Sequence, residues 1–203
     1  KVLPFGESLY LGLPRDYTNE QVTVTAEKYN ATLETTDIES VVKLMCDKNI
    51  VAMFQGRSES GPRALGNRSL CADPRGPEVK DKMNVIKKRQ KFRPFAPMIL
   101  EEHVHEYFEM PGGISHAPYM QFVAKCRQPE QFPAIIHKDG TSRVQTVSKN
   151  DSPGFRKLLE DWHSLTGCPM LLNTSLNIKG QPMVNNIADA QAFYTKYNVP
   201  VIT

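Results

Sequence analysis

The chain has 203 residues, of which 40% are hydrophobic and 23% are charged, which suffices for one substantial core but is short for two independent ones. No apolar run approaches the roughly 18 residues that span a bilayer and no secretory leader is visible, so we expect a cytoplasmic domain without membrane contact. The net charge of +3 is unevenly placed, because residues 57–93 hold eleven Lys and Arg against four acidic residues. This local excess predicts one anionic ligand site, whereas a nucleic-acid-binding protein would carry a broader basic surface.

The cysteines indicate the redox state of the protein, and the chain ends indicate its domain organisation. Four cysteines lie far apart without a C-x-x-C pair, which favours reduced thiols and argues against a disulfide framework or a zinc site; we predict no metal ligands. The chain begins without Met and ends in VPVIT, a pattern typical of the middle of a buried strand. We expect a domain excised from a longer protein, with residues 1–35 as a loop-rich linker from a missing amino-terminal domain and 36–203 as the truncated domain proper.

The first half of the chain combines apolar periodicity with an unusual loop. Apolar residues recur at helical spacing after Thr36-Asp37, and the run NIVAMFQ has the composition of a buried strand. The following stretch, GRSESGPRALGNRS, mixes arginines with glycines, serines and a proline and suits neither helix nor strand. The predicted elements are a helix from residue 36, a strand at 49–55, this loop at 56–69, and a helix at 77–88.

The second half alternates strands and helices. Lys138-Asp139-Gly140 between two β-rich runs is a turn signal and predicts a hairpin. The clearest helix is expected to be capped by Ser152 and ended by Gly167. Its apolar stripe comprises Phe155, Leu158, Leu159, Trp162 and Leu165. The predicted elements are strands at 95–100 and 119–126 around a short helix, a hairpin at 134–147, a helix at 153–166, a strand from 168, a helix near 186–196 and a last strand. The expected fold class is α/β, a mixed β-sheet with flanking helices.

The loop at 56–69 holds Arg57, Arg63 and Arg68. It is either an ordinary polar loop or a loop shaped to hold a phosphate or carboxylate. Ligand sites in α/β folds lie beyond strand ends, and an arginine offers a fork of donors that matches such anions. The residues alone leave both readings open.

Two further segments carry chemistry-bearing groups. KKRQKFRPFAP concentrates five cations in residues 87–93, which repel one another unless an anion is bound. A solvated helix end explains some of Lys87, Lys88 and Arg89, but it explains Arg93 poorly. NTSLN alternates Asn173, Ser175 and Asn177 in strand register, so these groups can bind and orient a ligand, unless they form only a hydrogen-bonded turn. His103 and His105 lack metal-ligand spacing and are expected at the surface.

Taken together, GRSESGPRALGNRSLCADPR, KFRPFAP, DGTSRVQTV and CPMLLNTSLNIKGQPMV resemble the carboxy-terminal domain of the O-carbamoyltransferases, which include nodulation, cephalosporin and aminoglycoside-antibiotic enzymes. The resemblance implies a YrdC/Sua5-like twisted sheet and a reaction of ATP, with Mg²⁺, and carbamoyl phosphate to carbamoyl adenylate. It also implies an amino-terminal actin/Hsp70-like domain of the same chain, holding a bound transition metal, that transfers the carbamoyl group to a hydroxyl acceptor.

The resemblance also implies roles for individual residues. A K-x-R pair would fall on Lys87 and Arg89, with Lys88 competing for the lysine position, and an S-x-N pair on Ser175 and Asn177. The implied catalytic residues are Arg63, Lys87, Arg89, Arg143 and Ser175. Together with the residue patterns above, we expect substrate- or nucleotide-binding roles for Arg57, Arg68, Lys88, Arg93, Asn173 and Asn177.

Two other functions are compatible with the sequence. An RNA- or nucleotide-binding YrdC-like module without catalysis is one, but only Phe92 and Phe95 stand among the basic residues where a stacking surface would need more aromatics. A purely structural docking domain is the other, and it leaves the local charge excess unexplained.

Overall fold

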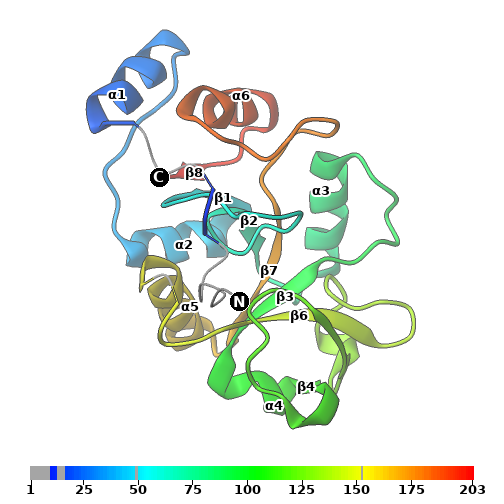
Figure 1. The fold of residues 1–203 in the computed structure, drawn as a ribbon. Coiled ribbons are helices and arrows are strands. Elements are labelled where there is room, and N and C mark those ends of the chain that lie inside the picture. The colour runs from blue at the N-terminus through cyan, green and yellow to red at the C-terminus, as the bar shows by residue number, and fades with distance from the viewer. Residues whose placement is uncertain (1–9, 13–16, 49, 152) are drawn as a thin grey trace, which may run out of the picture.

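The computed structural model describes residues 10–12, 17–48, 50–151 and 153–203. Within these ranges, one mixed eight-stranded sheet lies between two layers of helices, with the strand order β4-β5-β6-β3-β7-β2-β1-β8 (Figure 1). The pairs β1–β8 and β3–β6 are parallel, and the other neighbours are antiparallel. The predicted mixed α/β sheet is therefore confirmed.

The elements have the following bounds. The strands are β1 (Ile50–Phe54), β2 (Arg68–Ala72), β3 (Ala96–Leu100), β4 (Phe108–Glu109), β5 (Phe122–Cys126), β6 (Thr141–Val147), β7 (Met170–Ser175) and β8 (Val201–Ile202). The helices are α1 (Asn19–Lys28), α2 (Ile38–Lys48), α3 (Pro77–Lys87), α4 (Val104–Tyr107), α5 (Pro153–Thr166) and α6 (Ile187–Tyr197), with short 3₁₀ turns at Glu101–His103, Pro111–Gly113 and Pro129–Gln131. None of the helices in the described ranges is long and apolar enough to cross a membrane.

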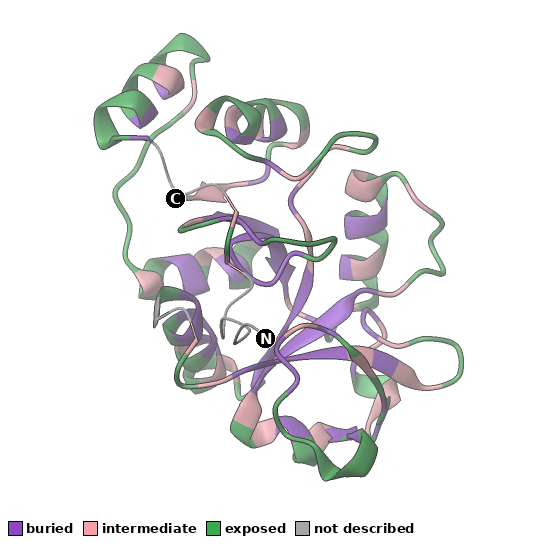
Figure 2. Ribbon diagram, in the orientation of Figure 1, coloured by how far each residue is buried: buried purple, intermediate pink, exposed green. Residues whose placement is uncertain are grey.

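Each face of the sheet carries its own hydrophobic cluster, so the central strands are buried on both sides (Figure 2). On one face, α2 and α5 contribute side chains such as Met45 and Trp162, which join Leu171 of β7. On the other face, α3 and α6 contribute side chains such as Met83 and Phe193. The α2–α5 cluster ends partway along the strands: Asn173, two residues after Leu171 on the same face of β7, lies outside it. A smaller cluster of Leu65, Ala96 and Met120 packs on this part of the sheet, beside the functional groups.

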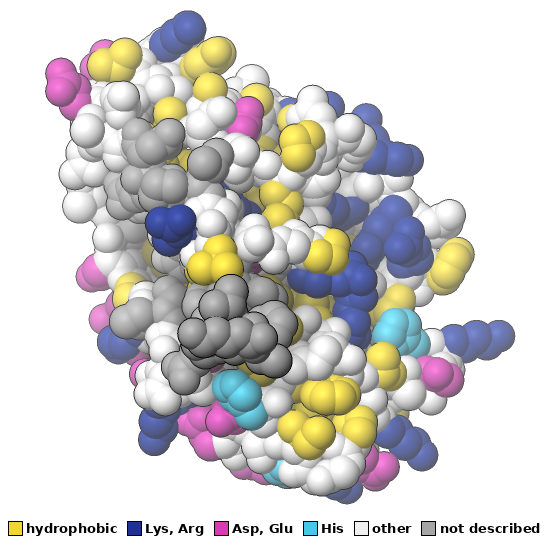
Figure 3. All heavy atoms as spheres, in the orientation of Figure 1, with side chains coloured by type: hydrophobic (Ala, Val, Ile, Leu, Met, Phe, Trp, Pro, Cys, Tyr) yellow, Lys and Arg dark blue, Asp and Glu magenta, His cyan; other side chains and the backbone are white. Residues whose placement is uncertain are grey.

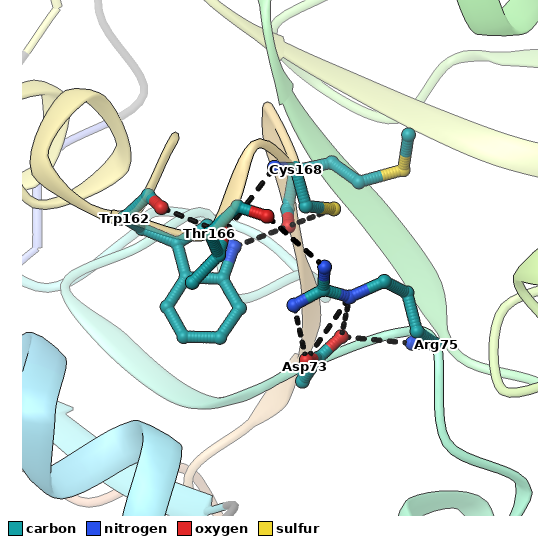
Figure 4. Close-up of polar contacts among 6 residues, drawn as sticks. Asp73, Arg75, Trp162, Thr166 and Cys168 are labelled. Carbon is teal, nitrogen blue, oxygen red and sulfur yellow. Dashed lines mark hydrogen bonds and ion pairs between the residues drawn. The ribbon is translucent and has the colours of Figure 1, made fainter. Parts of the chain in front are cut away.

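Polar contacts tie together the opposite end of the strands (Figure 4). Arg75, just after β2, donates from Nε to Asp73 Oδ1 (2.9 Å) and from a terminal nitrogen to the carbonyl of Thr166 at the end of α5 (3.2 Å). Trp162 is 1% exposed, and its indole N–H donates to the carbonyl of Met170 (3.1 Å). Trp162 is thus a core residue, as its helical stripe predicts.

Most of the expected elements are confirmed. Residues predicted to begin or end the helices do so in the structure. Asp37 Oδ1 accepts from the backbone N–H of Ser40 (2.8 Å) at the start of α2, and Gly167 ends α5 with φ +69°. The expected cap Ser152 lies outside the described residues. Leu165 is 57% exposed, so the buried stripe of α5 ends at Trp162.

Three expectations are wrong. Residues 1–35, expected to be loop-rich, contain helix α1, which begins with a capping box between Thr18 and Gln21; their role as a linker stays a prediction. In the hairpin, the turn at Gly140 is present with φ +80°, but residues 134–140 form turns and no strand; β6 pairs instead with β5 and β3. Finally, β8 is half-buried at the sheet edge beside β1, whereas the sequence pattern predicts the middle of a buried strand.

Candidate functional site

A cavity of ≈ 960 Å³ opens where β7 ends at Ser175, and a second cavity of ≈ 600 Å³ adjoins it. Lys87, Arg89, Arg93 and Ser175 line both. The larger is also lined by the cations Arg63, Lys80, Lys138 and Arg143, and the smaller by Lys88 and Lys179. Among the described residues, no acidic side chain lines either cavity. Figure 3 shows Lys and Arg side chains gathered beside α3. Six of the eleven cations of residues 57–93 therefore line one surface hollow: Arg63, Lys80, Lys87, Lys88, Arg89 and Arg93.

Lys87 anchors the junction of the two cavities. It is the last residue of α3, and its Nζ donates to the carbonyl of Ser175 (2.7 Å), to Ser175 Oγ (3.1 Å) and to Asn177 Oδ1. Burial lowers the pKa of Lys87 to about 8, and the positive charge of Arg89 adds to this effect. The K-x-R lysine and the S-x-N pair, about 90 residues apart in sequence, are thus in direct contact.

Lys88 has a different environment from Lys87. It adopts a left-handed conformation (φ +46°) that ends α3, its side chain is exposed, and its carbonyl accepts from Lys179 Nζ (2.9 Å). Lys87, and not Lys88, therefore contacts Ser175 and Asn177.

Arg89 is held rigidly beneath the basic loop 88–94. Its Nε donates to Asn84 Oδ1 (2.7 Å), a terminal nitrogen donates to the carbonyl of Pro94 (3.0 Å), and its guanidinium lies 3.9 Å from the centre of the Phe95 ring. Asn84 also donates to the carbonyls of Lys91 and Arg93 (3.2 Å each). Burial lowers the pKa of Arg89 to about 10, with Arg93 and Arg143 adding to it, so the group stays charged at neutral pH.

Arg143 and Arg63 face the larger cavity from different elements. Arg143 lies on β6, where burial lowers its pKa and the charge of Arg63 lowers it further. Its Nε is buried and has no hydrogen-bond partner among the described residues. Arg63 is exposed on the loop before β2. Two like charges held together with an unused donor indicate a site for an anion.

The loop that carries Arg63 is shaped by Glu59 and by glycine. Glu59 Oε1 accepts from the backbone N–H groups of Leu65 (2.7 Å) and Asn67 (2.9 Å). Gly66 adopts φ +128°, and a Cβ there would lie 3.1 Å from the Phe155 ring. Both features fix the backbone path that places Arg63 at the cavity.

Arg57 and Arg68 are not brought to this cavity. Arg57 is exposed, and its side chain donates to the carbonyl of Leu11 (3.4 Å). Arg68 is 0% exposed: its guanidinium lies 4.2 Å from the Phe54 ring centre and donates to backbone carbonyls that include Val184 (3.1 Å) and Gln55 (2.7 Å). A ligand-binding role for Arg68, expected from its loop, conflicts with this burial; we assign it a structural role.

Asn173 lies at the cavity floor and is 1% exposed. Its Nδ2 donates to the carbonyl of Ala64 and to Gln145 Oε1 (2.9 Å each), and Gln145 Nε2 donates to the carbonyl of Leu65 (2.9 Å). These amides hold the loop that carries Arg63, here called the arginine loop, against the sheet.

Several site residues escaped the sequence reasoning. Glu59, Asn84 and Gln145 act through the backbone that they hold, and no local pattern distinguishes them. Phe92 is 76% exposed at the rim of the larger cavity, whereas Phe95 is buried beneath Arg89. The position of Phe92 among cations was a signal that the sequence offered.

The donor set does not fit a metal ion held by this domain. No group of three or more His, Cys, Asp or Glu side chains suited to a metal occurs in the described ranges, and the cavity lining is cationic. Mg²⁺ prefers oxygen ligands, commonly carboxylates and substrate phosphates. Any Mg²⁺ at this site would be held by phosphates and not by these side chains.

Comparison with known proteins gives consistent matches over most of the chain. Residues 42–203 match the family described as carbamoyltransferase C-terminus. The nodulation protein NolO of Bradyrhizobium diazoefficiens is 42% identical over 86% of this chain and 33% of its own length. The nodulation protein NolNO of Sinorhizobium fredii is 45% identical over 72% of this chain and 22% of its own length. The chain thus spans a third or less of these relatives.

Solved structures show the same fold at low sequence identity. Full-length HypF in a phosphate- and nucleotide-bound form has a TM-score of 0.60 and 19% identity, over 82% of this chain and 20% of its own. HypF of T. kodakarensis has a TM-score of 0.56 and 19% identity, over 83% of this chain and 20% of its own. The predicted YrdC-like fold is therefore confirmed.

Proposed function

Because the chain belongs to the carbamoyltransferase C-terminus family, we propose that it forms carbamoyl adenylate from carbamoyl phosphate and ATP. The observation that carries this proposal is the cation-lined cavity in which Lys87, Arg89, Arg63 and Arg143 converge without an acidic neighbour among the described residues. Two highly anionic substrates meet in such a reaction, and positive charge must hold them together.

The chemistry divides into two balanced steps. Water takes up the phosphoryl group of carbamoyl phosphate, which releases phosphate and carbamate. A carbamate oxygen then attacks the α-phosphorus of ATP, the bond to the bridging oxygen breaks, and pyrophosphate leaves. In-line displacement of this kind depends on positioning and charge stabilisation and needs no covalent nucleophile on the protein.

The geometry supports distinct roles for the site residues. Lys87, fixed by Ser175 and Asn177, and Arg89, fixed by Asn84, are preorganised cations for the phosphates of ATP. Arg63 and Arg93 are exposed at the rim and meet the outer phosphates. The phosphates of the nucleotide would hold Mg²⁺, which would neutralise part of their charge, and Phe92 offers an aromatic face to the base.

We assign the second half-reaction to a domain outside these 203 residues, and the greater length of the relatives is compatible with such a domain. An amino-terminal actin/Hsp70-like domain, with its own transition metal, receives carbamoyl adenylate and transfers the carbamoyl group to a hydroxyl. The four cysteines are free thiols, which supports the cytoplasmic setting that such a pathway needs.

Recognition of RNA without catalysis is less well supported. Phe95 is buried beneath Arg89, so Phe92 alone, of the two aromatics within the basic segment, is available for stacking. The basic groups also converge on one hollow, whereas an RNA-binding surface follows a strand over several nucleotides.

The test is to supply the 203-residue chain with ATP, Mg²⁺ and carbamoyl phosphate and no hydroxyl acceptor. We expect slow release of AMP and pyrophosphate, because carbamoyl adenylate escapes into water and hydrolyses. Lys87→Met should abolish this release, and exposed Tyr29→Ala on the distant α1 segment should leave it unchanged.

Calorimetry gives an independent readout. A folded chain that shows no heat with millimolar ATP, and none with carbamoyl phosphate plus a non-hydrolysable ATP analogue, would overturn the proposal. Catalysed carbamoylation of a hydroxyl acceptor by this chain alone would show that the two half-reactions are assigned to the wrong domains.

A further inference from the structure

Three residues form one row across the middle of the sheet at the cavity floor. Ala96 of β3 pairs with Asn173 of β7. On the other side of β3, Met98 pairs with Gln145 in parallel register, so Ala96, two residues earlier, lies beside Arg143 of β6. Arg143, Ala96 and Asn173 all line the larger cavity. Because the central residue is an alanine, it places only a methyl group between the two outer side chains, and this methyl group packs with Leu65 and Met120.

The two outer residues of this row carry complementary unused hydrogen-bonding atoms. Arg143 Nε, a donor, and Asn173 Oδ1, an acceptor, are both buried and have no hydrogen-bond partner among the described residues. The amide of Asn173 cannot be reversed without loss, because its Nδ2 donates to the carbonyl of Ala64 and to Gln145 Oε1 (2.9 Å each). The site therefore offers one donor and one acceptor on either side of Ala96.

We propose that this row selects the carbamoyl group: Asn173 Oδ1 accepts from the carbamoyl NH₂, and Arg143 Nε donates to its carbonyl oxygen. Adjacent strands lie about 4.8 Å apart, so the outer backbones are separated by roughly 10 Å. A small planar amide with a hydrogen bond of about 2.9 Å on each side spans a gap of this order. This assignment rests on the proposed function and names the residues that make it specific for carbamoyl.

The predicted consequence is selectivity among acyl phosphates. Acetyl phosphate has the same carbonyl and phosphate but carries a methyl group where carbamoyl phosphate has NH₂. With acetyl phosphate, Asn173 Oδ1 stays unpaired against a methyl group, whereas Arg143 keeps its acceptor. Sites built to bond a substrate N–H reject analogues that lack it by large factors. Asn173 thus governs the choice between the two, and Arg143 acts on both.

The experiment compares kcat/KM for pyrophosphate release with carbamoyl phosphate and with acetyl phosphate, using the 203-residue chain. Wild type should prefer carbamoyl phosphate by about 100-fold or more, and Asn173→Ala should lower that preference about 10-fold or more. Arg143→Lys keeps the charge but loses Nε–H, and should slow both substrates with the preference kept. Tyr10→Phe is the matched control: it also loosens the arginine loop, by removing the Tyr10 hydroxyl that donates to the carbonyl of Leu65 (2.9 Å), but it keeps both bonds of the Asn173 amide and should leave the preference intact.

An unchanged preference in Asn173→Ala, or the same loss in Tyr10→Phe, overturns the proposal. If Asn173→Ala does not fold, Ala96→Val is the alternative test, because the larger side chain fills the space beside Arg143 and Asn173. Its affinity for carbamoyl phosphate should fall about 10-fold or more, and its affinity for ATP should be retained. Unchanged carbamoyl phosphate binding would refute the proposed carbamoyl contacts. If wild type releases no pyrophosphate, the proposed function fails separately. Calorimetric affinities for carbamoyl and acetyl phosphate in wild type and Asn173→Ala then test the selectivity itself, and equal affinities refute it.

Discussion

Arg63 and Arg68 stand five residues apart in one loop sequence, yet the fold puts them in opposite situations. Arg68 is 0% exposed, lies over the Phe54 ring and donates to backbone carbonyls from several segments. Arg63 is exposed and lines a cavity whose other cations are not paired with acids in its lining. The guanidinium of Arg68 therefore stabilises the fold of the chain, whereas the guanidinium of Arg63 is available to a ligand.

The difference shows how an anion site of this kind is supported. A buried arginine is stable only when hydrogen bonds replace its lost hydration, and carbonyls at the ends of β1 and β2 do this for Arg68. That arrangement fixes the start of β2. Glu59 fixes the backbone between the two arginines. Arg63 therefore projects from a rigid base, and its charge is available at the cavity without a large ordering cost on binding.

The largest expected effect separates these two arginines by stability. Arg68→Met removes the guanidinium donor from the carbonyls of Val184, Gln55 and Gly56, at about 1–3 kcal/mol each, so we expect a loss of about 3–5 kcal/mol in the free energy of unfolding. Arg63→Met should change it by less than about 0.5 kcal/mol, as surface substitutions do. Urea denaturation measures both. Equal losses would show that the loop arginines share one structural role.

Lys87 extends the comparison, because it lies at the cavity like Arg63 but is half-buried, between the exposed Arg63 and the buried Arg68. Its pKa in the folded chain is about 8, against 10.5 as the ordinary value. Between these values the unfolded chain holds a proton that the folded chain has released, so stability rises with pH. The free energy of unfolding of wild type relative to Lys87→Met should therefore increase by up to about 3 kcal/mol as pH rises from 8 towards 10.5.

The controls for Lys87 use its neighbour and a ligand. Lys88→Met removes the exposed adjacent lysine but keeps Lys87, so this variant should retain the rise in denaturation measured across the same pH range. Saturating pyrophosphate should move the rise to higher pH, because a bound anion favours the charged ammonium. A flat difference between wild type and Lys87→Met would contradict the burial of this amine.

Arg63 itself provides the next effect, on binding instead of stability. Arg63→Ala should weaken pyrophosphate binding by about 1.5–3 kcal/mol, the scale of a hydrogen bond to a charged group, because the exposed guanidinium meets the anion directly. Calorimetric titration gives the affinity, and the thermal midpoint should stay unchanged. If Arg63→Ala unfolds the domain, the ligand role belongs to another arginine.

The sequence reveals the fold and the site to different extents. Helices α2, α3 and α5 follow from apolar spacing and caps that operate locally, such as Asp37. The partnership of Lys87 with Ser175 and Asn177 was expected only through the family resemblance, because no local pattern joins residues that far apart. The burial of Arg68 could not be predicted, since it depends on carbonyls as distant as Val184. The hairpin failed for a related reason: β-rich composition at 134–137 favours a strand, but β6 finds its partners in β5 and β3.

The smallest effect on ligand affinity is expected at Ser175, because its hydroxyl acts on the ligand only through Lys87. Ser175 Oγ accepts from Lys87 Nζ (3.1 Å) and donates to Asn177 Oδ1 (2.8 Å). In Ser175→Ala, Lys87 keeps the carbonyl of residue 175 and the amide of Asn177, so pyrophosphate affinity should fall by only about 1 kcal/mol, the net value of a single hydrogen bond.

The loss of affinity in Ser175→Ala should also depend on pH, unlike that of Arg63→Ala, because removing an acceptor disfavours the charged ammonium and lowers the pKa of Lys87 further. Affinity should therefore decline from a lower pH than in wild type, and Ser175→Thr, which keeps a hydroxyl, should restore both the affinity and its pH range. A loss in Ser175→Ala larger than that of Arg63→Ala, and independent of pH, would mean that the hydroxyl contacts the anion itself and that Lys87 is not its intermediary.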